Sequence, residues 1–202
     1  MRNRKFLKIE CIMLAVFLVA AAAVYTAPFA QGCRDLYDNM LRLHVIANSD
    51  SERDQQLKLL VRDTLLREGA AVFDGETNVD NARAKLEPRF DELRQAAMAE
   101  LRRHGCTDDV RITLEKTYFE TRTYGEYTVP AGMYTAMCVR IGEAKGHNWW
   151  CVMFPPLCLP AASSGADAAF TADGKAVLSS NPKYDVRFKV VEWMQKAKMA
   201  RR

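Results

Sequence analysis

The alternation of apolar and polar positions divides the chain beyond residue 40 into strands and helices. Residues 41–47, LRLHVIA, alternate and therefore predict a strand that faces a core on one side. Ser51 and Asp54 then match a capping box, in which the serine oxygen accepts an orphan N–H at a helix start. The predicted helix carries an apolar stripe from Leu57 to Leu65, so we expect one of its faces to be buried.

A second helical stripe runs from Ala82 to Leu101 in steps of three and four residues. Pro88 interrupts this stripe, because proline removes a backbone donor and clashes with the preceding turn. Since the stripe keeps its phase across Pro88, we predict a kink or two abutting segments. Gly105 follows a basic last turn and predicts the end of the helix.

Strand patterns dominate the next part of the sequence. Residues 110–122 predict another half-buried strand, and Gly-bearing loops at 125–132 and 142–146 flank a further one. The run 149–154 is apolar throughout, which is typical of a central strand covered on both faces.

The C-terminal part changes character at residues 160–182, which are rich in Ala, Ser and Gly and predict a loop or a loop with one weak helix. Residues 184–190 alternate again and predict a last strand, and 191–199 predict a short terminal helix. This order predicts one α+β domain over residues 41–202, with two main helices packed on one face of a mostly antiparallel sheet.

The N-terminal segment is of a different kind. A basic head, MRNRKFLK, precedes CIMLAVFLVAAAAVYTAP, 18 residues without a charge. This pattern predicts a signal peptide or membrane anchor over residues 1–30, and it leaves open whether that segment is cleaved. Residues 31–40 then predict a polar connector. We therefore expect an exported protein, attached to the membrane through its N-terminus if that segment is retained.

Net charge gives no reason to expect a nucleic-acid partner. The chain carries 29 Lys and Arg against 25 Asp and Glu, and four of these basic residues and one acid precede residue 31. The remainder therefore has 29 − 4 = 25 basic and 25 − 1 = 24 acidic residues.

No familiar catalytic or metal-binding motif is present. Nucleophile elbows, H-E-x-x-H, phosphate-binding loops and C-x-x-C are missing, and the three His fall on separate predicted elements, so we expect neither a metal nor a cofactor. The remaining catalytic alternative is a secreted Cys-His hydrolase or peptidase centred on Cys151 and His147. A four-residue separation along a strand would hold these side chains about 13 Å apart, which argues against it.

Two further features concern Cys151 and its neighbours. Cys151 and Cys158 could form a disulfide if Pro155-Pro156 turns the chain, and the alternative is that both are small buried hydrophobic residues. Trp149 and Trp150 must point to opposite faces of a regular strand. If one of them is exposed, it is a natural contact for a protein partner.

Three runs resemble the stage II sporulation protein R family: LRLHVIANSDSERDQQLKLLVRDTLL, YGEYTVPAGMYTAMCVRIGEAKGHNWWCVMFPPLC and YDVRFKVVEWMQK. The resemblance implies a non-enzymatic signalling protein of endospore-forming bacteria. Such a protein is exported from the forespore into the intermembrane space. There it triggers a membrane-bound aspartic protease of the mother cell, which cleaves the sigma-E precursor. A structural envelope protein is a third hypothesis.

The contact surface for such a protease is expected in the loops at residues 48–51, 124–132 and 146–150. The candidate partner-binding residues are Asn48, Ser49, Asp50, Tyr124, Tyr127, Gly132, His147, Asn148, Trp149 and Trp150.

Overall fold

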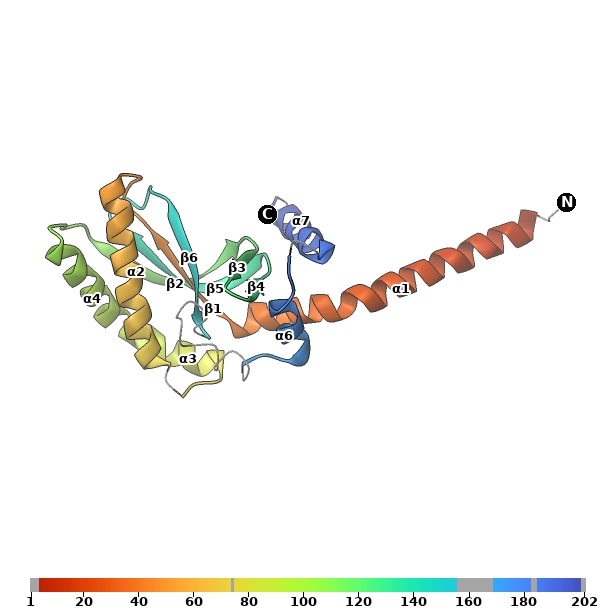
Figure 1. Cartoon of the computed structure of the whole chain (residues 1–202), viewed down its shortest axis with the longest axis horizontal. Coiled ribbons are helices and arrows are strands. Elements are labelled where there is room, and N and C mark those ends of the chain that lie inside the picture. Colours follow the sequence, from red (N-terminus) through yellow and green to blue (C-terminus); the bar gives the residue numbers. More distant parts are fainter. Residues whose placement is uncertain (1–3, 74, 156–168, 183–184, 201–202) are drawn as a thin grey trace.

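The structure is a computed structural model that describes residues 4–73, 75–155, 169–182 and 185–200 (Figure 1). The elements are α1 (Arg4–Asn39), β1 (Leu41–Ile46), α2 (Glu52–Val72), α3 (Val79–Leu86), η1 (Glu87–Arg89), α4 (Phe90–Arg103), β2 (Val110–Phe119), β3 (Arg122–Tyr124), β4 (Tyr127–Val129), β5 (Gly132–Ile141), β6 (Asn148–Phe154), α6 (Ala172–Leu178) and α7 (Val186–Met199). The predicted α+β class is confirmed.

The main sheet has the strand order β2-β5-β1-β6, with β1 and β5 parallel and the other two pairings antiparallel. A separate hairpin pairs β3 with β4, where the sequence indicated only a loop. The prediction that residues 149–154 form a central strand is wrong, because β6 is the edge of the described sheet. Its apolar residues are explained by burial on both faces, with Cys151 in one core and Val152 in the other.

Helices α2, α3 and α4 lie on one side of the sheet (Figure 1). Their apolar stripes and the inward residues of the strands form the first core. As predicted, the second helical stripe breaks at Pro88, where η1 joins two abutting helices. Asn78 caps the first of them, and Gly105 (φ 68°) follows the second in the left-handed conformation that ends a helix.

The opposite face of the sheet is covered by the end of α1, the β3–β4 hairpin, α6 and α7 (Figure 1). The predicted connector at residues 31–40 is wrong, because α1 continues through Pro28 to Asn39. Phe29, Cys33 and Leu36 follow one another at helical spacing and are all buried in this second core. Burial of this apolar stripe stabilises the helical conformation of residues 31–39.

The C-terminal strand predicted at residues 184–190 is also wrong. Helix α7 begins at Val186, with the Asp185 carboxylate accepting the Arg187 N–H as its cap. Only Phe188 of the alternating apolar residues there is buried, and Tyr184 lies outside the described residues. Within the predicted loop at 160–182, the described part contains the short helix α6.

Among the described residues, α1 is the one helix long and apolar enough to cross a membrane, as the sequence predicted for an anchor or signal segment. Its N-terminal part projects away from the domain (Figure 1).

Candidate functional site

Two loops lock together at one end of the sheet, residues 48–51 after β1 and residues 142–147 before β6. We call them the loop platform. The backbone amides of Lys145 and Gly146 donate to the carbonyls of Asn48 and Ala47, over 3.1 and 2.9 Å. A Cβ at Gly146 would collide with the Ser49 carbonyl, and one at Gly142 (φ 54°) with the Asn48 side chain. The glycines therefore allow the second loop to pack directly on the first.

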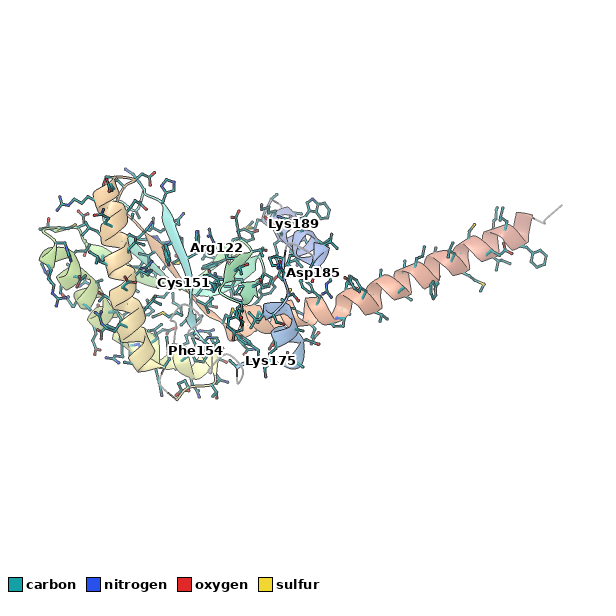
Figure 2. All side chains as sticks on the ribbon, in the orientation of Figure 1. Arg122, Cys151, Phe154, Lys175, Asp185 and Lys189 are labelled. Atoms are coloured by element: carbon teal, nitrogen blue, oxygen red, sulfur yellow. The ribbon has the colours of Figure 1, made fainter. Side chains whose placement is uncertain are left out.

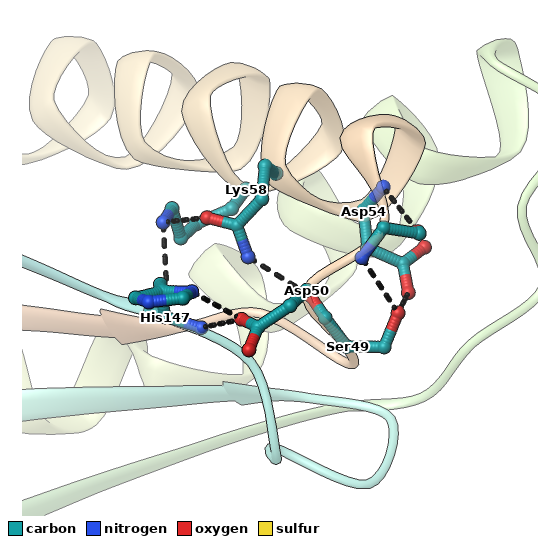
Figure 3. Close-up of polar contacts among 7 residues, drawn as sticks. Ser49, Asp50, Asp54, Lys58 and His147 are labelled. Carbon is teal, nitrogen blue, oxygen red and sulfur yellow. Dashed lines mark hydrogen bonds and ion pairs between the residues drawn. The ribbon is translucent and has the colours of Figure 1, made fainter.

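Polar side chains complete the first loop of the platform. The Asn48 Oδ1 accepts the Glu143 N–H at 2.9 Å, and its Nδ2 donates to Asp54 at 3.0 Å. The Ser49 hydroxyl also donates to Asp54, at 2.6 Å (Figure 3). These bonds, with the one from Ser49 as the strongest, hold the pKa of the Asp54 carboxyl below its usual value. Asp54 thus fastens the loop to the start of α2. The Ser51 hydroxyl oxygen accepts the backbone N–H of Asp54, as the predicted capping box requires.

The second loop is fastened through His147. Its backbone N–H donates to the Asp50 carboxylate at 2.6 Å, and its Nδ1 contacts the same oxygen. Lys58 of α2 donates to the His147 carbonyl at 2.9 Å (Figure 3), and burial lowers the pKa of that ammonium group. The side chains of Asp50 and His147 remain mostly exposed. Four predicted contact residues, Asn48, Ser49, Asp50 and His147, therefore meet on this platform.

A groove of about 610 Å³ adjoins the platform. It is lined by Thr121, Arg122, Thr123, Tyr124, Asn148, Trp149 and Trp150. Trp149 and Trp150 belong to the cores on opposite faces of β6, yet both line the groove. The groove therefore runs along the outer edge of β6, with β3 as its other wall. In the described part of the chain, no strand pairs with that edge.

Positive charge is concentrated at the groove. Arg122 lines it, and none of the seven lining residues carries a carboxylate. Arg42 is fully buried behind Tyr124, in the wall of the groove. It donates to the Tyr124 hydroxyl at 2.7 Å and to the Cys151 carbonyl at 2.8 Å. Its guanidinium lies 4.1 Å from the centre of the Phe119 ring. Among the described residues, Nη1 of Arg42 has no hydrogen-bond partner.

The charge of Arg42 is therefore held by aromatic rings and neutral oxygens. Burial lowers the pKa of Arg42, and the nearby charge of Arg122 acts in the same direction. Two like charges so close together leave this wall of the groove electropositive.

Both tryptophans are half-buried and have partners. Arg62 of α2 stacks on Trp149, with its guanidinium carbon 4.3 Å from the ring centre. Trp150 stacks on His44 at 3.7 Å between ring centres, on the other face of the sheet. Each indole is held in place and still presents part of its surface to the groove, which is typical of residues that dominate binding to a protein partner.

Two candidate contact residues lie elsewhere. Gly132 is buried at the start of β5, where the Tyr37 ring occupies the position a Cβ would take. Tyr127 packs partly into the second core and is not among the groove residues. The structure gives Gly132 a packing role and places Tyr127 on β4, behind the strand that forms the groove wall.

The predicted Cys-His pair is not assembled as a catalytic pair. Cys151 is 2% exposed and already forms a disulfide, so it has no thiol to deprotonate, and the His147 ring is engaged by Asp50. The predicted disulfide partner, Cys158, lies outside the described residues, and the pairing stays a prediction.

A different Cys-His contact forms across the sheet. Cys138 Sγ lies 3.8 Å from His44 Nδ1, and His44 Nε2 lies 2.9 Å from the Asn148 Oδ1. Sequence reasoning missed it because strand pairing brings together residues 94 positions apart. Burial, reinforced by Glu115, raises the pKa of the Cys138 thiol to about 12, so at neutral pH the thiol is protonated and is a poor nucleophile.

His44 should make stability depend on pH. Burial lowers the pKa of His44 below its usual value of 6.5, so the unfolded chain takes up this proton first. Its contribution to stability is complete above about pH 6.5 and falls as the pH drops below that, by at most about 1.4 kcal/mol per pH unit. Urea unfolding between pH 7 and 5 should show this slope, and His44→Gln should flatten it. The same slope in His44→Gln and in the exposed control His104→Gln would contradict this assignment.

A sequence family matches the region that contains these features. The family described as stage II sporulation protein R (spore_II_R) covers residues 37–164, more than half of the chain. The chain belongs to the stage II sporulation protein R family. One relative is the stage II sporulation protein R of Bacillus subtilis (strain 168), which is 36% identical over 128 residues. The match covers 63% of this chain and 57% of the relative. No solved structure matches the chain.

Membership of the stage II sporulation protein R family makes this a sporulation protein. The matched region extends from the end of α1 past β6, and so includes the loop platform, the groove and all ten candidate contact residues. Helices α6 and α7 and most of α1 fall outside it, and so does the third run of the sequence resemblance, at residues 184–196.

Proposed function

We propose that this protein is an exported, non-enzymatic signal that activates a membrane-embedded aspartic protease of the mother cell, which then cleaves the sigma-E precursor. The domain acts from the space between the forespore and mother-cell membranes. Family membership and the apolar helix at the N-terminus support this function.

The groove beside β6 is the observation that carries the proposal. The groove lies along the edge of β6 and combines two partly exposed tryptophans with an arginine, which are residue types that often dominate binding to a protein partner. Trp149 and Trp150 supply contact area on the two faces of that edge. The adjacent loop platform is held rigid by its own hydrogen bonds, so little conformational entropy is lost when a partner docks against it.

The charge of the groove specifies the chemistry of the segment that it accepts. Arg122 lines the groove, the buried charge of Arg42 lies behind it, and no carboxylate is among the lining residues. An extended segment of the protease that carries Asp or Glu complements this field. Binding can activate the protease only if that segment is presented differently in its active and inactive states.

Reconstitution in a heterologous bacterium tests the function. The full chain, the protease and the sigma-E precursor are co-expressed, and the shorter, processed sigma factor is measured by immunoblot. We expect cleavage only when all three are present, and we expect the chain to co-purify with the protease. Cleavage that is equally fast without the chain would refute the proposal. A chain that supports cleavage without binding the protease would refute the direct contact.

A further inference from the structure

Helix α7 exposes a continuous apolar stripe. Val186, Val190, Trp193 and Met194 are 67%, 49%, 73% and 48% exposed. Their spacing of four, seven and eight residues from Val186 places them on one face of the helix. The opposite face of α7 is already used, since Phe188 is buried in the second core and Val191 packs against it. The stripe is therefore additional to the face that holds α7 on the domain.

Basic residues border this stripe on both sides. At about 100° per residue, Lys189 and Lys196 fall along one border and Arg187 and Lys198 along the other. Glu192, the one acidic residue of α7, lies towards the domain and is paired with Lys189 and Lys196. An apolar stripe that contains Trp between two rows of cations is the pattern of a helix that lies in a membrane interface.

The fold also fixes α7 beside the long apolar helix α1. The guanidinium of Arg187 lies 4.9 Å from the ring centre of Tyr25 and 4.5 Å from that of Phe29, both on α1. The rings of Phe29 and Phe188 are in edge contact at 5.1 Å. In Figures 1 and 2, α7, with Asp185 and Lys189 labelled, lies at the end of the domain from which α1 projects.

The length of α1 places this contact at the membrane boundary. A hydrocarbon core about 30 Å thick accommodates about 20 helical residues. A span that begins at Cys11, after the last charged residue of the head, therefore ends near Ala30. Phe29 and the start of α7 then lie at the level of the lipid headgroups.

We propose that α7 is an interfacial helix that lies on the same bilayer that α1 crosses, with its apolar stripe between the headgroups and the acyl chains. Lys189, Lys196 and Lys198 lie level with the headgroups and favour anionic phospholipids, while the Arg187 guanidinium is held by Asp185 and the rings of α1. A single spanning helix would leave the domain free to rotate, and a second attachment fixes its orientation at the membrane. This attachment is independent of the proposed contact with the protease.

Quenching by brominated lipid tests the attachment directly. The full chain is reconstituted into vesicles of ordinary phosphatidylcholine or of phosphatidylcholine brominated near the headgroup, with and without phosphatidylglycerol. We expect brominated lipid to quench part of the tryptophan emission, and we expect this part to be lost in Trp193→Phe. Trp149 and Trp150 should keep their emission, because they lie in the groove of the domain.

A second variant separates membrane contact from a structural role. Val190→Glu places a charge in the middle of the stripe at an exposed position, so the domain should stay folded while Trp193 is no longer quenched. Lys175→Glu on α6 is the matched control and should leave quenching unchanged. Equal emission in ordinary and brominated lipid would overturn the proposal. The proposal would also be overturned if a second copy of the chain, detected as cross-linked dimers, shields Trp193 from the brominated lipid.

Discussion

Arg122→Glu is expected to slow activation of the protease about tenfold, equivalent to about 1.4 kcal/mol of binding free energy. The substitution replaces the cation that lines the groove with a carboxylate, which repels an acidic segment. Arg122 is exposed and outside the buried cores, so the stability of the domain should be almost unchanged. The measurement is the initial rate of precursor cleavage in the reconstituted system, with the expression level matched.

Arg111→Glu provides the matched control for this charge reversal. Arg111 is an exposed arginine on β2, at the opposite edge of the sheet, so the net charge changes equally while the groove does not. It should leave cleavage within about twofold of the wild-type rate. If Arg111→Glu and Arg122→Glu slow cleavage equally, net charge is responsible, and the groove is not the contact surface.

Arg42→Ala is expected to lower the free energy of unfolding by about 3 kcal/mol. The substitution leaves a cavity between Phe119 and the sheet and removes the donors to the Tyr124 hydroxyl and the Cys151 carbonyl. Removal of the desolvated charge offsets part of this cost. Arg42→Met keeps most of the volume and also removes the charge, so its loss should be smaller, about 1 kcal/mol.

Urea unfolding of the full chain in detergent micelles measures both substitutions. The comparison identifies the cause, because Arg42→Ala and Arg42→Met lose the same hydrogen bonds and differ mainly in volume. An equal loss in the two variants would show that the hydrogen bonds dominate. If Arg42→Met is more stable than wild type, the buried charge is retained at a cost to stability, and its role lies in the groove.

Local patterns predicted the helices of the first core well. The stripe from Ala82 to Leu101, the break at Pro88 and the stop at Gly105 each depend on residues close together in sequence, and the structure has all three. The platform residues were found for a similar reason, because Asn, Ser, Asp and Gly mark loops. Their mutual hydrogen bonds across 95 or more positions could not be read from spacing.

The errors have a common physical origin. Alternation at residues 184–190 fits a strand, but a helix whose inner face needs only Phe188 and Val191 satisfies the same sequence. Residues 31–39 have the sequence pattern of a connector, and only the second core, which buries Cys33 and Leu36, shows why they are helical. In both segments, tertiary burial decided the structure over local pattern.

The sequence by itself determined the α+β class, the long apolar N-terminal segment of a signal peptide or anchor, the helices of the first core and the resemblance to the sporulation family. Each of these depends on composition or on short-range periodicity. Only the tertiary structure decided that β6 lies at the sheet edge, that Arg42 lies buried behind Tyr124, and that α7 lies against α1. Strand order and the docking of distant helices depend on contacts between residues far apart in the chain, which no local pattern specifies.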